Sequence, residues 1–263
     1  MELEVLLSCM HQSDMSIAEH SQIQSDLLII NQCNKNNYEE KNNGIYCSRM
    51  ISTTERGLSR SRNMALKNAV GDICLICDDD ELLDKEYREK ILKAFEEHPQ
   101  ADILAFIVSV SNTDYDTKKY KDHVIKLNYF SSLKISSCQI AFRRKSVINK
   151  SILFDESVGS GVSKAGGEEN IFLHDCLKNG LQALYVPVHI GYVSQEVSQW
   201  SHNLFTQAFF EDRGRFTKKL WGRHIFATAY AFFYTIKKYP KYKHKTTFTV
   251  ALFSTLKGIF IEQ

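Results

Sequence analysis

The sequence predicts an α/β fold with a mostly parallel central sheet, and three observations support this prediction. Short apolar runs alternate with helix-like segments through the first two thirds of the 263 residues, an order typical of strands joined by right-handed helical crossovers. Residues 73–77 are continuously apolar, as in a strand buried on both faces. Only 3 prolines and 12 glycines occur, and 43% hydrophobic with 24% charged residues excludes a disordered, collagen-like or disulfide-rich chain.

The first half of the chain is expected to contain four strands and one helix. The strands are expected at residues 5–7, 27–30, 45–51 and 73–77. The helix is expected over residues 58–70, where a serine is available as N-cap and three apolar residues share one side. The cap is Ser59 or Ser61, and the buried residues are Leu66, Ala69 and Val70.

The second half continues the alternation less regularly. A helix is expected between an N-cap at Asp84 and a stop at Pro99. Its buried side repeats at helical spacing through Tyr87, Ile91 and Phe95. The further expected elements are a strand at 103–110, a polar loop at 112–126, a strand at 135–142, a glycine-rich loop at 159–167, a helix at 168–179 and a strand at 182–193.

The last fifth of the chain differs in charge from the rest. Residues 213–263 contain 11 Lys/Arg and one acid, Glu262, so their net charge is about +10. The first 212 residues contain 22 Lys/Arg and 30 acids, so their net charge is about −8, and the whole chain has a net charge of +2. From Trp200 onward the chain consists of helix-like segments rich in aromatic residues and lysines. We therefore expect two domains, residues 1–199 and a basic, aromatic, helical extension at 200–263. The apolar side of the last helix repeats every four residues at Phe248, Leu252, Leu256 and Phe260.

This composition favours contact between the tail and an anionic membrane surface, because aromatic side chains with lysines and no acids suit an interfacial helix. Packing within the protein or a homo-oligomer would explain the apolar side as well. Nucleic-acid binding is not expected, since no recognised module accompanies the basic residues. No stretch reaches the roughly 18 apolar residues that span a bilayer, no secretory leader is visible, and seven scattered cysteines favour a reducing compartment. The expected location is cytoplasmic, peripheral on the inner face of the cell membrane.

Four consecutive carboxylates, Asp78 to Glu81, follow directly after the buried strand at 73–77. Adjacent carboxylates repel one another, and a divalent cation neutralises them. Mg²⁺ or Mn²⁺ held by one or two carboxylates together with a substrate diphosphate is a common arrangement. The alternative is an exposed acidic turn before a helix whose N-terminus favours negative charge.

Two further motifs indicate a site for a negatively charged ligand. Arg56, Arg60 and Arg62 lie where the first expected helix begins, and helix N-termini with arginine forks bind phosphate. A solvated basic surface is the alternative. Glu168 and Glu169 follow a glycine pair at the start of a later helix, where one of them is suited to be a general base or both simply complement the helix dipole. Because ligands collect at the carboxyl ends of parallel strands, residues 8–12, 31–32 and 77–81 are expected nearby.

In this order and spacing the motifs resemble those of the family 2 glycosyltransferases of bacterial capsular and exo-polysaccharide synthesis, which have the GT-A nucleotide-sugar-binding fold. The resemblance covers roughly residues 4–195 and includes residues 55–63. The turn Asp78-x-Asp80 is similar to the family's DxD metal motif, and Glu168-Glu169 is similar to its Glu-Asp motif. Two departures stand out: the second acid of that pair is one methylene longer, and Asn31 with Gln32 replaces an acidic residue common after the second strand. Amide or backbone groups are therefore expected to recognise the uracil or ribose.

The resemblance implies a metal-dependent, inverting transfer of a sugar from a nucleoside-diphosphate donor, in the first place a UDP-sugar, to a hydroxyl of a lipid-linked oligosaccharide. Asp80, assisted by Asp78, would hold Mg²⁺ or Mn²⁺ against the diphosphate. Glu169, with Glu168 as the competing candidate, would deprotonate the acceptor hydroxyl. The implied donor-binding residues are Ser8, Met10, Gln12 and Asn31 around the nucleoside, together with Arg56, Arg60, Arg62, Asp78 and Asp79.

Other functions would use similar residues. A nucleotidyltransferase usually has a glycine-rich loop after its first strand, which residues 8–12 lack, and a DxD phosphatase would place its acids and a lysine in a different order. The non-enzymatic alternative is a membrane-associated assembly protein whose acidic cluster is only surface. Metal-dependent nucleotide binding distinguishes the transferase from this alternative.

Overall fold

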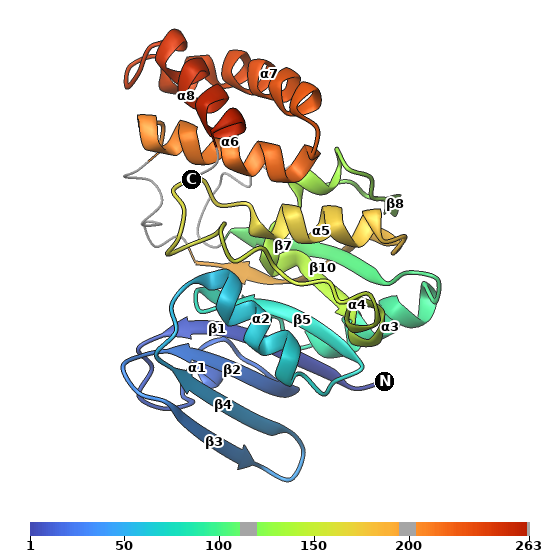
Figure 1. Ribbon diagram of the computed structural model, residues 1–263. Helices are drawn as coiled ribbons and strands as arrows, with labels where there is room; N and C mark the ends of the chain where they lie inside the picture. Colours follow the sequence, from blue (N-terminus) through green and yellow to red (C-terminus); the bar gives the residue numbers. More distant parts are fainter. Residues whose placement is uncertain (111–119, 195–203, 262–263) are drawn as a thin grey trace.

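The computed structural model describes residues 1–110, 120–194 and 204–261, and a ten-stranded sheet lies at its centre (Figure 1). Alternate residues of each central strand pack on opposite faces. Val5 and Leu7 join a core with helix α3 (Tyr87–Glu97), whereas Leu6 joins a core with helices α2 (Leu58–Asn68) and α5 (Glu168–Lys178). Helices therefore cover both faces of the sheet, and the α/β prediction is confirmed.

The first half of the sheet is the parallel part. β1 (Leu3–Met10) pairs in parallel with β2 (Asp26–Gln32) and β5 (Ile73–Asp78), and β2 pairs in parallel with β4 (Cys47–Thr53). All four correspond to predicted strands, each shifted or extended by a few residues. Figure 1 shows their carboxyl ends together at one edge, as parallel pairing requires.

The second half of the sheet is mixed in direction. β9 (Ile140–Arg143) lies antiparallel between β5 and β7 (Ile103–Val110), β10 (Ala183–Val193) runs parallel to β7, and β6 (Glu81–Leu83) runs antiparallel to β10. The sequence did not predict three of the strands, β6, β3 (Asn37–Asn42) and β8 (Ile125–Lys126). β3 pairs antiparallel with β4, and β8 pairs antiparallel with β10. The sheet is thus less parallel than expected, because apolar runs report the burial of a strand but not its direction.

Several predicted helix boundaries need correction. The N-cap of α2 is Gly57, and both Ser59 and Ser61 lie inside the helix. Val70 is 62% exposed, since the backbone leaves the helix at Ala69, whose ψ is 141°. The N-cap of α3 is Glu86, and the carboxylate of Asp84 accepts a hydrogen bond from Lys90 Nζ at 2.7 Å instead.

The middle of the chain is more irregular than predicted. The expected strand at 135–142 is mostly replaced by a short 3-10 helix, Ser137–Gln139, and only its last residues form β9. A second 3-10 helix, Ser132–Lys134, precedes it. Two short helices, α1 (Ile17–His20) and α4 (Arg144–Asn149), complete the α/β body. Most of the expected loop at 112–126, and Trp200, lie outside the described residues.

Three helices follow the body: α6 (Gln207–Trp221), α7 (His224–Tyr242) and α8 (Phe248–Phe260). Thr206 and Thr247 cap α6 and α8 through their side chains. α6 and α8 approach so closely that a Cβ atom on Gly214 or Gly258 would overlap a backbone oxygen of the other helix. None of the helices in the described residues is long and apolar enough to cross a membrane.

Candidate functional site

A cleft of about 450 Å³ lies at the carboxyl ends of β1, β2 and β5, where the sequence placed the ligand. Its volume lies within the range of small-molecule sites. Seven of the lining residues belong to strand ends and the acidic turn, and the others belong to the start of α2 and the glycine-rich loop. The lining residues are Ser8, Cys9, Met10, Gln32, Asp78, Asp79, Asp80, Arg56, Gly57, Leu58, Ser160 and Gly161.

Two hydrogen bonds from backbone N–H groups hold the start of α2 against residues that line the cleft. Gly57 adopts φ +115°, a conformation that favours glycine, and its N–H donates to Gln32 Oε1 at 2.8 Å. The N–H of Leu58 donates to the carbonyl oxygen of Ser160 at 3.1 Å. Because protein oxygens already accept from these two amides, Arg56 is the better-placed phosphate ligand at this end of the helix.

The four acids of the turn, Asp78 to Glu81, differ in accessibility. Glu81 is buried and accepts a hydrogen bond from the N–H of Asp78 at 2.9 Å. Asp78 accepts two hydrogen bonds from Arg62 Nη2, at 2.9 and 3.1 Å, and one from Ser137 Oγ at 3.1 Å.

Asp79 and Asp80 are the two more accessible carboxylates of the turn. Partial burial and the charges of Asp78 and Asp79 raise the pKa of Asp80 to about 6, and burial with the charge of Asp78 also raises the pKa of Asp79. This mutual repulsion is what a cation would relieve.

The donor set of the turn fits Mg²⁺ or Mn²⁺. Both ions prefer oxygen ligands and are commonly held by one or two carboxylates plus substrate phosphates rather than by a complete protein cage. Within the described part of the chain no group of three or more His, Cys, Asp or Glu side chains forms such a cage. A metal at this turn would therefore take its remaining ligands from the substrate and water, with Asp80 as the carboxylate least engaged by the protein.

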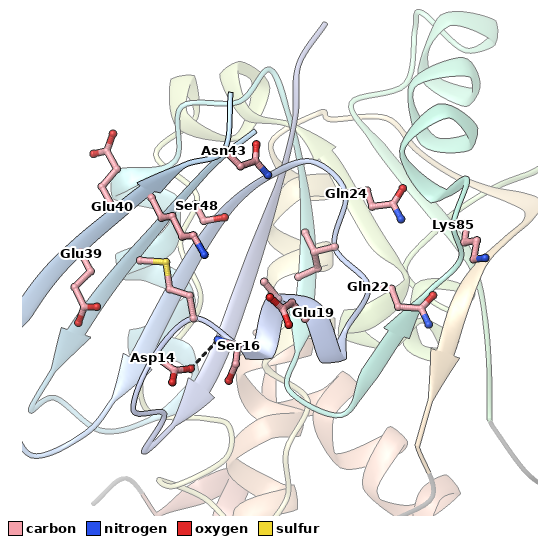
Figure 2. A pocket seen from close by; sticks show the side chains of 14 residues that line it. Asp14, Ser16, Glu19, Gln22, Gln24, Glu39, Glu40, Asn43, Ser48 and Lys85 are labelled. Carbon is pink, nitrogen blue, oxygen red and sulfur yellow. Dashed lines mark hydrogen bonds between the residues drawn. The ribbon is translucent and has the colours of Figure 1, made fainter. Parts of the chain in front are cut away.

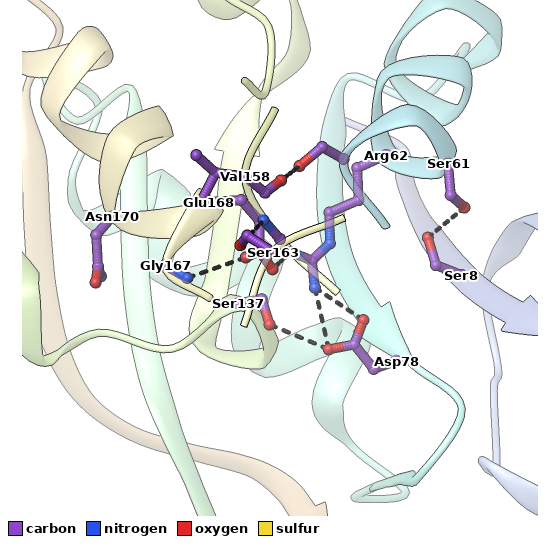
Figure 3. Close-up of polar contacts among 12 residues, drawn as sticks. Ser8, Ser61, Arg62, Asp78, Ser137, Val158, Ser163, Gly167, Glu168 and Asn170 are labelled. Carbon is purple, nitrogen blue, oxygen red and sulfur yellow. Dashed lines mark hydrogen bonds and ion pairs between the residues drawn. The ribbon is translucent and has the colours of Figure 1, made fainter. Parts of the chain in front are cut away.

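Arg62 links the acidic turn to the second pair of acids. Its side chain, 3% exposed, reaches from α2 with Nη2 on Asp78 and with Nη1 on Glu168 Oε1 at 2.8 Å (Figure 3). A buried guanidinium needs such partners, since an unpaired buried charge is costly. The two motifs, 90 residues apart in sequence, therefore meet across one side chain.

Glu168 and Glu169 stand in different environments at the start of α5. Glu168 is buried, and besides Arg62 it accepts a hydrogen bond from the N–H of Gly167 at 3.1 Å (Figure 3). Glu169 is partly buried, and burial together with the negative charge of Glu168 raises its pKa to about 8. Glu168 is thus paired with a cation, whereas Glu169 has the proton affinity of a general base near neutral pH.

The other predicted donor-binding residues are distributed unevenly. Ser8 and Met10 line the cleft, and Ser61 Oγ donates to Ser8 Oγ at 2.8 Å. Gln12 does not line it. Asn31 is completely buried and does not line it either; its amide donates to the carbonyl of Gln12 and accepts from its N–H, so a direct contact of Asn31 with a ligand in the cleft is not supported. Arg60 also lies outside the lining, 3.3 Å from Glu156.

Some lining residues had been indicated from the sequence only as members of a segment, and one residue that contacts Asp78 had not been indicated at all. Gln32 follows Asn31 in β2. Because successive side chains of a strand point to opposite faces, Gln32 lines the cleft where Asn31 does not. Ser160 and Gly161 belong to the predicted glycine-rich loop, whose position over the cleft is a tertiary feature. Ser137 carried no local signal, since its contact with Asp78 spans 59 residues.

A second, larger hollow of about 960 Å³ lies beside α1, β3 and β4 (Figure 2). Its lining includes Asp14, Glu19, Glu39 and Glu40, and none of the residues predicted to bind donor or metal. Asp14 is used locally, accepting from the N–H of Ser16 at 2.8 Å. The motif residues therefore make the smaller cleft the candidate functional site.

Comparisons with known proteins identify the family and the fold. The sequence profile of the family described as "Glycosyl transferase family 2" matches residues 4–161. No curated protein sequence matches the chain. Among solved structures, that of residues 1–349 of TarS from S. aureus is 14% identical, with 99% of this chain and 81% of that chain covered and a TM-score of 0.68. The same TarS segment in complex with UDP-GlcNAc gives 14% identity, 98% and 82% coverage and a TM-score of 0.69.

A more distant structural match extends the comparison to another donor. The mannosyltransferase PcManGT from Pyrobaculum calidifontis, in complex with GDP-Man and Mn²⁺, is 14% identical, with 98% of this chain and 73% of that chain covered and a TM-score of 0.52. At these identities the likeness concerns the fold, and the fold is GT-A, as expected.

Proposed function

The chain belongs to glycosyl transferase family 2, and we propose that it is an inverting, metal-dependent transferase that moves a sugar from a nucleoside-diphosphate donor, a UDP-sugar in the first place, to an acceptor hydroxyl. The observation that carries the proposal is the buried Arg62, which contacts both Asp78 of the acidic turn and Glu168 of the α5 acid pair. Arg62 thus connects a turn suited to hold a diphosphate with a pair of acids suited to accept a proton, although Glu168 and Glu169 do not themselves line the cleft. The neighbours solved with UDP-GlcNAc and GDP-Man favour a nucleotide sugar as the donor class.

The donor is proposed to bind with its nucleoside between Ser8, Met10 and Gln32 and with its diphosphate toward Arg56 and the acidic turn. Asp80 and, through one oxygen, Asp78 would hold Mg²⁺ or Mn²⁺, which when bound would neutralise charge on the departing diphosphate. Arg62 keeps Asp78 in place by the paired hydrogen bonds. Arg56 is already oriented at the cleft edge by Asn34 Oδ1, 2.8 Å from its Nη2.

Glu169 is proposed as the base for the acceptor. It takes the proton of the acceptor hydroxyl while that oxygen bonds to the anomeric carbon on the side opposite the diphosphate. The bond from the anomeric carbon to the diphosphate oxygen breaks, and its electron pair leaves with the nucleoside diphosphate. In-line displacement of this kind inverts the anomeric centre. Glu168 is the weaker candidate, because Arg62 and the Gly167 N–H already occupy its oxygens.

The acceptor is proposed to be a lipid-linked oligosaccharide in capsular or other polysaccharide synthesis, reached from the cytoplasmic face of the membrane. Support comes from the basic, aromatic composition of residues 200–263, which we propose as an extension separate from a catalytic domain at 1–199. A nucleotidyltransferase or a non-catalytic assembly protein gains no support from the family match.

Nucleotide release from a panel of UDP- and GDP-sugars with Mn²⁺ and a polyprenyl-linked acceptor tests the proposal. We expect one donor to give acceptor-dependent release, and Glu169→Gln to lower its rate by 10²–10⁴-fold, the usual contribution of a general base. Glu96→Gln, at an exposed position of α3, is the matched control and should retain the rate. A Glu169→Gln variant with the full rate would overturn the assignment of the base.

A further inference from the structure

Helix α7 presents its larger apolar side chains outward. Along most of the helix the buried residues are small, Ala227, Ala231 and Thr235, and Tyr242 in the last turn is its one large buried side chain. A helix of a water-soluble protein normally has the reverse arrangement, with the large apolar residues inside. We call the opposite, exposed side the outer face of α7; its apolar residues and their exposed fractions are Ile225 74%, Phe226 55%, Phe232 43%, Phe233 57%, Ile236 61% and Tyr239 42%.

The outer face continues onto α8. Phe253 and Phe260 are 71% and 57% exposed, and the ring of Phe260 lies 5.1 Å from that of His224 at the start of α7. Figure 1 shows α6 between these two helices and the α/β body. An apolar surface of this extent on a single chain indicates an interaction site.

Positive charge adjoins the apolar residues. Lys237, Lys238, Lys241, Lys243 and Lys245 lie at the C-terminal end of α7 and directly after it, and no acid occurs between residues 213 and 261. Burial and the neighbouring Lys241 and Lys237 lower the pKa of Lys238, a sign that these cations repel one another. An anionic partner would relieve the repulsion, whereas a second copy that presented the same face would add to it, because its lysines carry the same charge.

We propose that the outer face of α7, with Phe253 and Phe260 of α8, docks on a bilayer leaflet that contains anionic phospholipid. The apolar side chains enter the boundary between headgroups and acyl chains, and the lysines meet the headgroup phosphates. This is the interaction of an interfacial helix, which lies in the membrane plane rather than crossing it. The inference rests on this surface and not on the proposed transfer reaction.

α6 contacts the α/β body next to the candidate site, so membrane docking of α7 and α8 would also position the body. A Cβ atom on Gly167 would lie 2.5 Å from the ring of Phe216, so α6 abuts the residue before Glu168. Lys219 Nζ forms an ion pair with Asp155 at 2.6 Å. Docking would therefore fix the orientation of the cleft relative to the lipid surface.

Co-sedimentation of the full chain with vesicles tests the proposal. The vesicles are pure phosphatidylcholine, or phosphatidylcholine with 30% phosphatidylglycerol, at low and at high salt. We expect at least tenfold stronger partitioning onto the anionic vesicles, weakened by salt because screening shortens the reach of the lysines. Replacing Lys241, Lys243 and Lys245 together by glutamine should lower partitioning about a hundredfold, on the order of fivefold for each charge.

The apolar contribution has its own variant and control. Phe232→Ser, Phe233→Ser and Ile236→Ser combined should lower partitioning by about a hundredfold, given the free energy of burying such side chains. Ile45→Ser with Phe130→Ser is the matched control, because these residues are 79% and 70% exposed but belong to the α/β body. Circular dichroism melting shows whether each variant is folded, and the lysine variant decides the question if the apolar variant is not.

Three results would overturn the proposal. The first is that the wild-type chain does not partition onto anionic vesicles at low salt. The second is that the wild-type chain and both surface variants partition equally. The third is that light scattering shows a wild-type dimer, that the apolar variant is monomeric, and that vesicles bind neither protein. The last result would assign the face to a second copy. Because no readout requires a sugar donor, failure here leaves the proposed function untouched.

Discussion

Replacing Glu169 with glutamine is expected to stabilise the fold at neutral pH, even though it removes the proposed base. Burial and the charge of Glu168 raise the pKa of Glu169 from 4.5 to about 8 in the folded protein. Below pH 4.5 the folded and the unfolded chain both hold this proton, so the group has no effect on stability there. Between pH 4.5 and 8 the unfolded chain loses the proton and the folded one keeps it, so stability falls as pH rises.

The magnitude follows from the size of this interval. Each pH unit above 4.5 costs the folded state about 1.4 kcal/mol, so at pH 7 the penalty is about 3 kcal/mol as an upper limit. Glutamine cannot ionise and does not incur it. At roughly 2 °C for each kcal/mol in a chain of this size, Glu169→Gln should raise the melting temperature by about 6 °C at pH 7 and leave it unchanged at pH 4.

Thermal unfolding followed by circular dichroism at pH 4, 5.5 and 7, without metal or nucleotide, measures the effect. The control is Glu168→Gln, which should change stability in the opposite direction at pH 7, because it removes a charged partner of the buried Arg62. The reasoning about the environment of this carboxylate would be refuted if Glu169→Gln were no more stable than the wild type at pH 7. It would also be refuted if the variant were stabilised by the same amount at pH 4 as at pH 7.

The same structure gives three further predictions. With Glu169 as base, kcat/KM should rise about tenfold per pH unit up to pH 8 and then level off; a flat profile from pH 6 to 8 would exclude it. Arg62→Met should cost about 3–5 kcal/mol in urea unfolding by stranding two carboxylates, and a loss under 1 kcal/mol would contradict the bridging role. Gly167→Ala should destabilise more than Gly44→Ala, since both have positive φ but only the first would collide with Phe216; equal losses would argue against a tight α5–α6 contact.

The location of the site was predictable because the decisive patterns are local. The apolar run at 73–77 followed by acids predicted a buried strand with a candidate site at its end, and in the structure Asp78 ends β5 and lines the cleft. The glycine pair before Glu168 likewise indicated the start of α5, which begins at that residue. Neighbouring residues of one chain segment sufficed for these inferences.

The role of each residue was less predictable, because it depends on which side of an element a side chain occupies. Arg60 and Arg62 are two residues apart and so about 200° apart around a helix, and only Arg62 turns inward. Asn31 and Gln32 alternate across a strand, and only Gln32 lines the cleft. The direction of β9 was equally hidden, because its antiparallel pairing with β5 joins segments about 70 residues apart.

The most direct test of the central claim, that the cleft binds a nucleoside diphosphate through the acidic turn, is calorimetric titration with UDP, with and without Mn²⁺. The account predicts Mn²⁺-dependent binding that Asp80→Ala loses. Asp122→Ala, which removes an aspartate whose side chain is 97% exposed, should retain it. If the wild-type chain binds neither UDP nor GDP with Mn²⁺ present, the acidic turn is only a solvated surface and the proposed transfer reaction is contradicted.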